Sequence, residues 1–147
     1  MKFNDIEQHS WDELKPYLDT CLLPVTGLSG VEAPWEAVVE LERLRDALDL
    51  LEIPFKGRVV TYPALHYGTT TSDPASSDML DSVCANLKAS GFRYVVLVTA
   101  RSEDHVSLVC RNAELILRFT PDELESSLME AKQKASAAMT KLWSGSQ

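Results

Sequence analysis

The residues most able to do chemistry lie in two loops, each of which follows a predicted strand. The first loop, after the strand predicted over 57–62, contains His66, Tyr67, Thr69, Thr70 and Thr71. The second, after the strand predicted over 92–99, contains Arg101, Glu103 and Asp104. Ligands of α/β sheets bind in the crevice outside the carboxyl ends of the strands. We therefore expect all of these residues to bind a ligand, and we assign no catalytic residue.

Each group also has an ordinary structural interpretation. The hydroxyls of residues 69–72 could hold an anion near the start of the next helix, or they could serve as turn and cap residues. Arg101 with its neighbouring carboxylates could clamp a ligand, or form a helix cap with an exposed ion pair. His66 and His105 could act as bases, or bond to nearby backbone. The sequence leaves these alternatives open.

Several kinds of site lack the residues that they require. The three histidines form no H-x-H, H-x-E or H-x-x-x-H pair that would place two metal ligands on one element. Cys21, Cys84 and Cys110 are widely spaced in apolar surroundings, which is typical of buried free thiols and not of zinc ligands. The sequence contains no G-x-S-x-G elbow, P-loop or G-x-G-x-x-G motif. We predict neither a metal nor a cofactor.

Composition narrows the range of partners. The chain has 147 residues, of which 45% are hydrophobic and 24% charged, as expected for a soluble globular protein. Its net charge of −8 argues against a nucleic-acid partner, because phosphate binding needs a basic surface. The N-terminus has no apolar signal region, and no apolar run is long enough to span a membrane. We expect a cytoplasmic protein with no membrane partner.

The predicted elements alternate between helix and strand. Strands are expected over 20–25, 57–62, 92–99 and 114–119, and helices over 11–18, 34–53, about 76–90 and 121–142. Residues 103–110 are ambiguous, and a short helix capped by Ser102 is favoured over a hairpin strand. This order requires crossover connections. It predicts an α/β fold, a single-domain three-layer αβα sandwich over 1–147 with a mostly parallel sheet of about four strands and a frayed tail at 143–147.

Three segments resemble the creatininase-type amidohydrolases. That family has a strand ending L-P-V-G-S-x-E-x-H-G, a later P-x-x-Y-G segment and a hydrophobic strand ending N-G-H-x-x-N. The similar segments here are Leu23-Pro24-Val25, residues 63–68 and residues 90–98. The family holds two divalent metals with the Glu and His of the first motif, a later Asp and the His of the third motif. The resemblance implies a related scaffold.

The resemblance also implies that the metal ligands are gone. By ungapped offset, the first Glu and His fall on Ser29 and Val31, the later Asp falls on Glu40, and the last His falls on Arg101. A carboxylate that some members carry falls on Glu103. Without imidazoles there is no metal-activated water. A guanidinium could instead neutralise carboxylates that would otherwise need a metal.

The whole chain, including the run over 17–24, is also similar to the small, uncharacterised YpiF-like family of Gram-positive bacteria. This similarity implies a bacterial origin and no particular activity.

The favoured interpretation is a non-catalytic, creatininase-like domain that binds an unknown protein or small-molecule partner at the carboxyl edge of its sheet. The enzyme alternative is a metal-independent hydrolase that uses His66 or His105 as base and Arg101 as electrostatic stabiliser. A third possibility is an assembly protein that uses the apolar stripe of the last helix, and Trp143 after it has no obvious core partner. A homo-oligomer therefore stays open.

Overall fold

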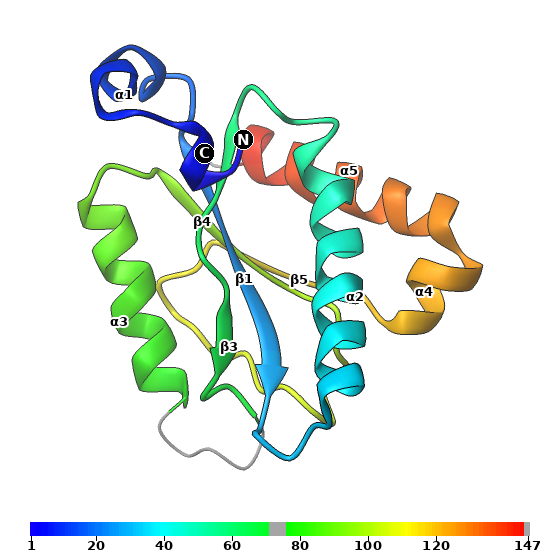
Figure 1. Ribbon diagram of the computed structural model, residues 1–147. Coiled ribbons are helices and arrows are strands. Elements are labelled where there is room, and N and C mark those ends of the chain that lie inside the picture. The colour runs from blue at the N-terminus through cyan, green and yellow to red at the C-terminus, as the bar shows by residue number, and fades with distance from the viewer. Residues whose placement is uncertain (71–75, 146–147) are drawn as a thin grey trace.

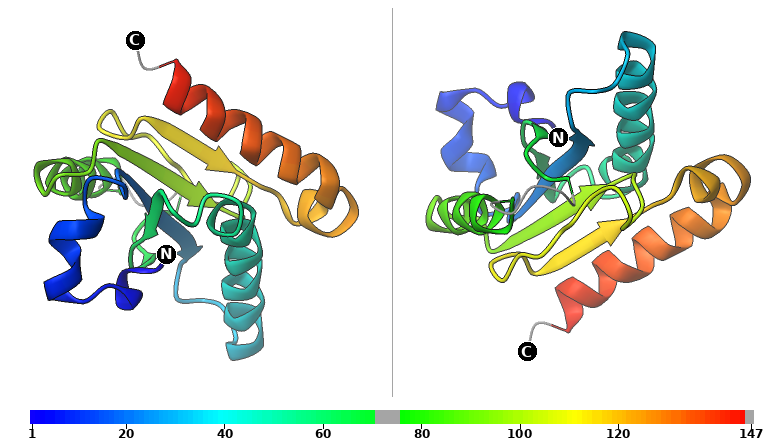
Figure 2. Two further views of the ribbon diagram at one scale, coloured as in Figure 1. Left: turned by 90° about the horizontal axis from the view of Figure 1, so that it is seen from above. Right: turned by 90° about the horizontal axis from the view of Figure 1, so that it is seen from below.

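The fold is a parallel sheet covered by helices on both faces (Figures 1 and 2). The computed structural model describes residues 1–70 and 76–145, and the side chains of 1–70 and 78–145. The strands are β1 (Thr20–Leu28), β2 (Val59–Thr61), β3 (Leu65–Tyr67), β4 (Tyr94–Thr99) and β5 (Leu115–Arg118). Their order is β2-β1-β4-β5, every strand pair is parallel, and β3 pairs with the second half of β1. The predicted α/β sandwich with a mostly parallel sheet is confirmed, with five strands in place of about four.

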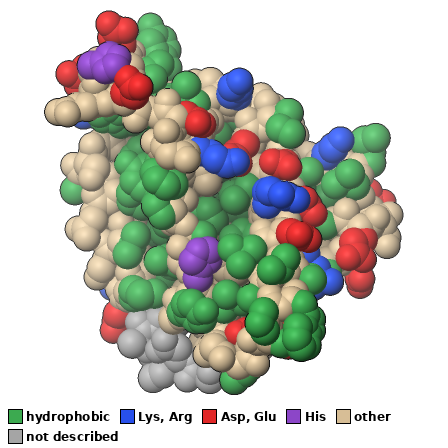
Figure 3. Space-filling model, viewed as in Figure 1, with side chains coloured by type: hydrophobic (Ala, Val, Ile, Leu, Met, Phe, Trp, Pro, Cys, Tyr) green, Lys and Arg blue, Asp and Glu red, His purple; other side chains and the backbone are tan. Residues whose placement is uncertain are grey.

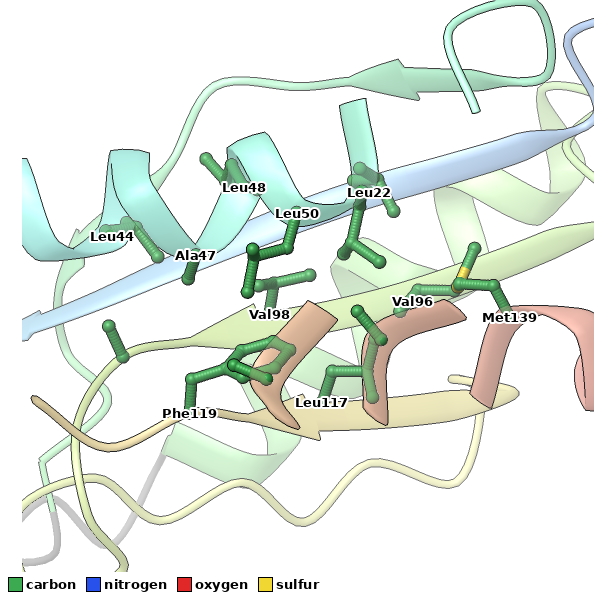
Figure 4. Close-up of a cluster of buried hydrophobic side chains, with 14 of the residues drawn as sticks. Leu22, Leu44, Ala47, Leu48, Leu50, Val96, Val98, Leu117, Phe119 and Met139 are labelled. Carbon is green, nitrogen blue, oxygen red and sulfur yellow. The ribbon is translucent and has the colours of Figure 1, made fainter. Parts of the chain in front are cut away.

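The helices divide between the two faces of the sheet. They are α1 (Gln8–Leu14), α2 (Pro34–Glu52), α3 (Ser76–Ala89), α4 (Pro121–Ser126) and α5 (Leu128–Ser144), after a short 3-10 turn η1 (Phe3–Asp5). One core lies between the sheet and α2 with α5, where Leu22, Ala47, Val96, Phe119 and Met139 pack together (Figure 4). The other core lies between the sheet and α1 with α3. Because β1 and β4 are buried on both faces, their sequences read as unbroken apolar runs.

Pro24 lies inside β1, which continues past the predicted strand over 20–25 to Leu28. Its Cα partner on β4 is Val98. Every second residue of a parallel strand directs its backbone groups to the same neighbour. The Leu22 carbonyl accepts the Tyr62 N–H on the β2 side, so Pro24 faces that side too, where residues 62–64 leave the ladder. The missing N–H therefore removes no ladder bond.

The helix predicted over 103–110 is absent. The Ser102 carbonyl accepts the N–H groups of His105 and Val106 in a single turn, and the chain is extended from there. Val106 forms an isolated antiparallel bridge with Thr70. Val106 and Leu108 are buried, whereas Val109 is 63% exposed, so the side chains do not follow helical spacing.

The ends of the other helices differ from prediction for local reasons. α1 begins at Gln8, so Ser10 lies in its first turn, where its hydroxyl donates to the Glu7 carbonyl. Thr120 caps α4, because its hydroxyl accepts the Glu123 N–H at 3.3 Å. The last helix is broken at Ser127, where the backbone (φ −133°, ψ 43°) leaves helical geometry. The sequence offers Asp73, Ser76 and Ser77 as candidate caps of α3, and their side chains lie outside the described residues.

Trp143 was predicted to lie in a frayed tail without a core partner, and this is wrong. It belongs to α5 and meets the Phe55 ring edge-on, with 4.9 Å between centroids. The Arg58 guanidinium lies 4.2 Å from the Trp143 centroid, and the indole N–H donates to the buried Thr20 hydroxyl at 2.9 Å. These contacts fix the end of α5 to the start of β1. Residues 146–147 lie outside the described residues.

Candidate functional site

A cleft of about 350 Å³ lies at the carboxyl edge of the sheet, where β1 and β4 end. Its lining residues come from three segments, and they are Gly27, Ser29, Val31, Glu32, Glu36, Thr70, Arg101, Asp104 and His105. The volume is in the range of small-molecule sites. The structure therefore brings three of the predicted ligand-binding residues together, namely Thr70, Arg101 and Asp104, and adds His105.

Arg101 is the best-anchored side chain of this cleft. Its Nε lies 3.0 Å from Oε2 of Glu40, with only 18% of the Arg101 side chain and 13% of the Glu40 side chain exposed. Its Nη1 donates to the Gly27 carbonyl at 2.8 Å. Glu40 also accepts from Nη1 of Arg43 at 3.1 Å. The Arg101 charge is thus largely compensated before any ligand arrives.

Gly27 permits this close approach of β1 to the following loops. Its φ is +83°, a backbone conformation that favours glycine. A β-carbon at this position would overlap with Cγ2 of Val106 and would lie 3.4 Å from Cδ of Arg101. The requirement is therefore both conformational and steric.

Arg118, the last residue of β5, fixes the loop after β4 through hydrogen bonds. The Arg118 guanidinium donates to the Arg101 carbonyl at 2.7 Å and to the Val106 carbonyl at 3.0 Å. Burial lowers the pKa of Arg118, and the nearby Glu103 raises it. An arginine remains charged at neutral pH in either case. Arg118 therefore fixes the segment that carries Arg101, Asp104 and His105.

Glu32 closes the loop between β1 and α2. It accepts the Ser29 N–H at 3.0 Å, the Ser29 hydroxyl at 3.1 Å and the Gly30 N–H at 2.9 Å. These hydrogen bonds, led by that from the Ser29 backbone, lower the pKa of Glu32 to about 2. Glu36 similarly accepts the Ala33 N–H at 2.9 Å. Glu32 is therefore ionised across the physiological range, beside the cleft.

The other predicted residues do not line this cleft. His66 bonds through Nδ1 to the Thr26 hydroxyl at 2.9 Å. Tyr67 is 60% exposed on β3, Thr69 is fully buried, and Glu103 is exposed. Thr71 lies outside the described residues. The predicted convergence is therefore partial.

Sequence reasoning missed the contribution of the loop after β1. Gly27, Glu32 and Glu36 line the cleft, yet none of them was predicted as a site residue, and only the creatininase resemblance singled out Ser29 and Val31 of this loop. The rule that selected the other two loops also applies to this one, because β1 is parallel to its neighbours and ends at the same edge. Arg118 gave no such signal, since it lies within a predicted strand.

Several polar groups of the cleft are already engaged in contacts within the protein. Nε and Nη1 of Arg101 already contact Glu40 and the Gly27 carbonyl, so they are not directed at a developing charge. The Ser29 hydroxyl donates to Glu32. Within residues 1–70 and 76–145, no group of three His, Cys, Asp or Glu side chains is arranged to hold a metal ion. In the same residues, no helix is long and apolar enough to cross a membrane.

The positions that the creatininase resemblance aligned with metal ligands are close together. Ser29, Val31 and Arg101 line the cleft, and Glu40 contacts Arg101, whereas Glu103 is exposed outside the lining. This geometry is compatible with the resemblance, which stays a prediction.

Comparison with known proteins gives a family and no activity. No curated protein and no solved structure matches the chain. The family model described as "Protein of unknown function (DUF2487)" matches residues 9–139. This match covers the strands and helices that form the cleft and most of both cores. The chain therefore belongs to the DUF2487 family of proteins of unknown function.

Proposed function

We propose that this protein is a non-catalytic α/β domain that binds a cationic group, an ammonium or guanidinium, in the cleft at the carboxyl edge of its sheet. The observation that carries the proposal is the Arg101–Glu40 ion pair. In this pair, Glu40 compensates the positive charge of Arg101, which lines the cleft. The lining also contains the carboxylates of Glu32, Glu36 and Asp104. The cleft is therefore negatively charged, in a chain whose net charge is −8.

The creatininase resemblance implies an evolutionary origin for this site. In the proposed scaffold, a serine and a valine replace the first pair of metal ligands, and a guanidinium replaces the last imidazole. The cation that neutralises Glu40 is then a side chain of the protein in place of a metal ion. Such a site retains a shaped, charged cleft and has no activated water.

Exposed apolar side chains beside the cleft favour a cation carried by a larger ligand. Val31 is 87% exposed, and Trp35 and Val38, in the first turns of α2, are 71% and 53% exposed. Figure 3 shows hydrophobic side chains gathered at this lower end of α2. Aromatic side chains are enriched at protein interfaces. The cation therefore comes either from a small molecule or from a Lys or Arg side chain of a polypeptide.

The test is a titration monitored by the backbone amide NMR signals of Gly27, Ser29, Thr70 and Arg101. One arm uses methylguanidinium, a second uses an Arg-containing peptide with apolar flanking residues, and a third uses acetate as a reversed-charge probe. We expect both cations to shift these signals, with dissociation constants of about millimolar for the small probe and tighter binding of the peptide. Acetate should cause no such shifts.

A pair of variants makes the test specific. Asp104 and Asp12 are both exposed, but only Asp104 lines the cleft. Asp104→Asn should weaken methylguanidinium binding several-fold, whereas Asp12→Asn should not change it. Acetate binding as strong as cation binding, or cation-induced shifts that are absent from the cleft, would overturn the proposal. A peptide that binds no better than methylguanidinium identifies the small molecule as the source.

A further inference from the structure

A second concave surface lies on the α2 and α5 side of the molecule, away from the cleft. This α2–α5 groove has a volume of about 590 Å³ and is lined by Asp46, Asp49, Leu50, Ile53, Pro54, Leu124, Leu128, Lys132 and Ser136. One wall is the second half of α2 with the residues that follow it, and the other is α4 with the first half of α5. It is the more apolar of the two surfaces.

Several hydrophobic side chains at this groove are largely exposed to solvent. Ile53, directly after α2, is 74% exposed, Leu128 is 43% exposed, and the adjacent Met129 is 69% exposed. Single exposed apolar residues are ordinary, but a cluster around an apolar groove is typical of an interaction site.

The charges of the groove are divided between its walls. Asp46 and Asp49 lie on the α2 wall, and Lys132 lies on the α5 wall. In a twofold dimer the same surface is used by both subunits, and when the twofold axis runs along the groove, each wall meets the opposite wall of the partner. An acidic wall and a basic wall on one surface therefore complement each other when two copies are related by a twofold axis.

We propose that the α2–α5 groove is the interface of a homodimer, in which Ile53 of each copy enters the groove of the other and the Asp46 and Asp49 wall meets the Lys132 wall. The α2 and α5 helices of the two copies then form a four-helix layer between the two sheets. The net charge of −8 on each chain opposes association, and the local Asp–Lys pairing together with apolar burial offsets that repulsion. This interface is independent of the proposed cation site.

The experiment is sedimentation velocity of the full chain from about 1 to 100 μM, the range in which a weak interface populates a dimer. The wild-type chain should change from monomer to dimer across this range. Ile53→Lys should remain monomeric, because it places a charge in the apolar groove. Val109→Lys is the matched control, since Val109 is 63% exposed and its segment packs on the opposite core, so this variant should dimerise normally. Circular dichroism melting at about 1 μM, where the wild-type chain is monomeric, should be unchanged in both variants.

Charge reversal tests the predicted pairing of the walls. The double variant Asp46→Lys/Asp49→Lys should weaken dimerisation at least tenfold, although it brings the net charge closer to zero. Lys132→Glu alone should also weaken it, and the triple variant should recover most of the wild-type affinity. A wild-type chain that stays monomeric throughout, or a dimer that tolerates Ile53→Lys, overturns the proposal. If the wild-type chain stays monomeric, a different protein becomes the candidate partner for the groove.

Discussion

Arg101 and Glu40 show how two side chains determine the character of the cleft. Arg101 pairs with Glu40 on α2 and also donates to the carbonyl of Gly27, which lies 74 residues earlier in the chain. The pair is well shielded from water, so its charges are screened less than those of surface pairs. The charge of the guanidinium is therefore compensated within the protein, and Glu32, Glu36 and Asp104 add further carboxylates to the lining of the cleft.

Glu32 provides a prediction about pH. Its pKa is about 2 in the folded protein, below its usual value, so its ionised form stabilises the loop over 29–32 above about pH 4.5. That stabilisation is lost as the pH falls from about 4.5 to about 2. Glu32→Gln should therefore lower the free energy of unfolding at pH 6, by less than about 1 kcal/mol because the site is solvent-exposed. Urea unfolding from pH 2 to pH 7 measures this difference, which should shrink toward pH 2, and parallel curves for the two proteins would contradict the assignment.

At the scale of the elements, the end of β1 is the critical junction between sheet and site. Gly27→Ala should destabilise the protein by more than about 2 kcal/mol, because the new β-carbon meets Val106 and the φ of +83° is unfavourable for alanine. Thermal unfolding monitored by circular dichroism measures the effect.

Gly57 is the matched control for this substitution. It has open space around its Cα and an ordinary φ, so Gly57→Ala should be neutral or stabilise by up to about 1 kcal/mol. Equal effects of the two alanine variants would show that the approach of β1 to the loop after β4 is not tight.

The end of α5 gives a second prediction at this scale. Trp143→Ala removes the Phe55 and Arg58 contacts and the hydrogen bond to Thr20, and should cost about 2–4 kcal/mol. Trp35→Ala is the control, because Trp35 is 71% exposed and its loss should change stability by about 0.5 kcal/mol or less. Urea denaturation of both variants distinguishes them, and equal costs would place Trp143 outside the core.

The sequence predicted the long elements well and the short ones poorly. The α2 helix and the β4 strand were predicted because apolar periodicity and capping residues agree over many residues. β3 is only three residues long, and its pairing with β1 depends on a contact that local sequence does not encode. The segment over 103–110 was misread because its apolar residues pack singly against the sheet and not along one helical face.

Tertiary contacts also decided which apolar residues are buried. The periodic set of α2 included Val38, Val39 and Leu41, yet these are 53%, 39% and 41% exposed. The first half of α2 projects from the body of the molecule, with its N-terminal end outermost (Figure 2). Periodicity identifies a helix and its apolar positions, but only the crossing of the helix over the sheet determines where burial begins.

At the scale of the whole molecule, the two candidate binding surfaces lie at different ends of α2. The cleft contacts the start of this helix and the α2–α5 groove contacts its end. Thr70, Arg101 and Asp104 were predicted near this edge, because strand order places the loops after the strands there, but most of the other lining residues were not predicted as ligand-binding. The groove was not, since it depends on the break at Ser127 and on the angle between α5 and α2.

The central proposal is that the Arg101–Glu40 pair replaces a metal ion at the cleft, as the creatininase resemblance implies. Metal analysis of the purified chain, followed by calorimetric titration with Zn²⁺, Mn²⁺ and Ni²⁺, tests it most directly. The account predicts less than stoichiometric metal, no saturable binding at the cleft, and no change in either result for Glu40→Gln. Stoichiometric metal that stabilises the fold strongly and is lost in Glu40→Gln would contradict it.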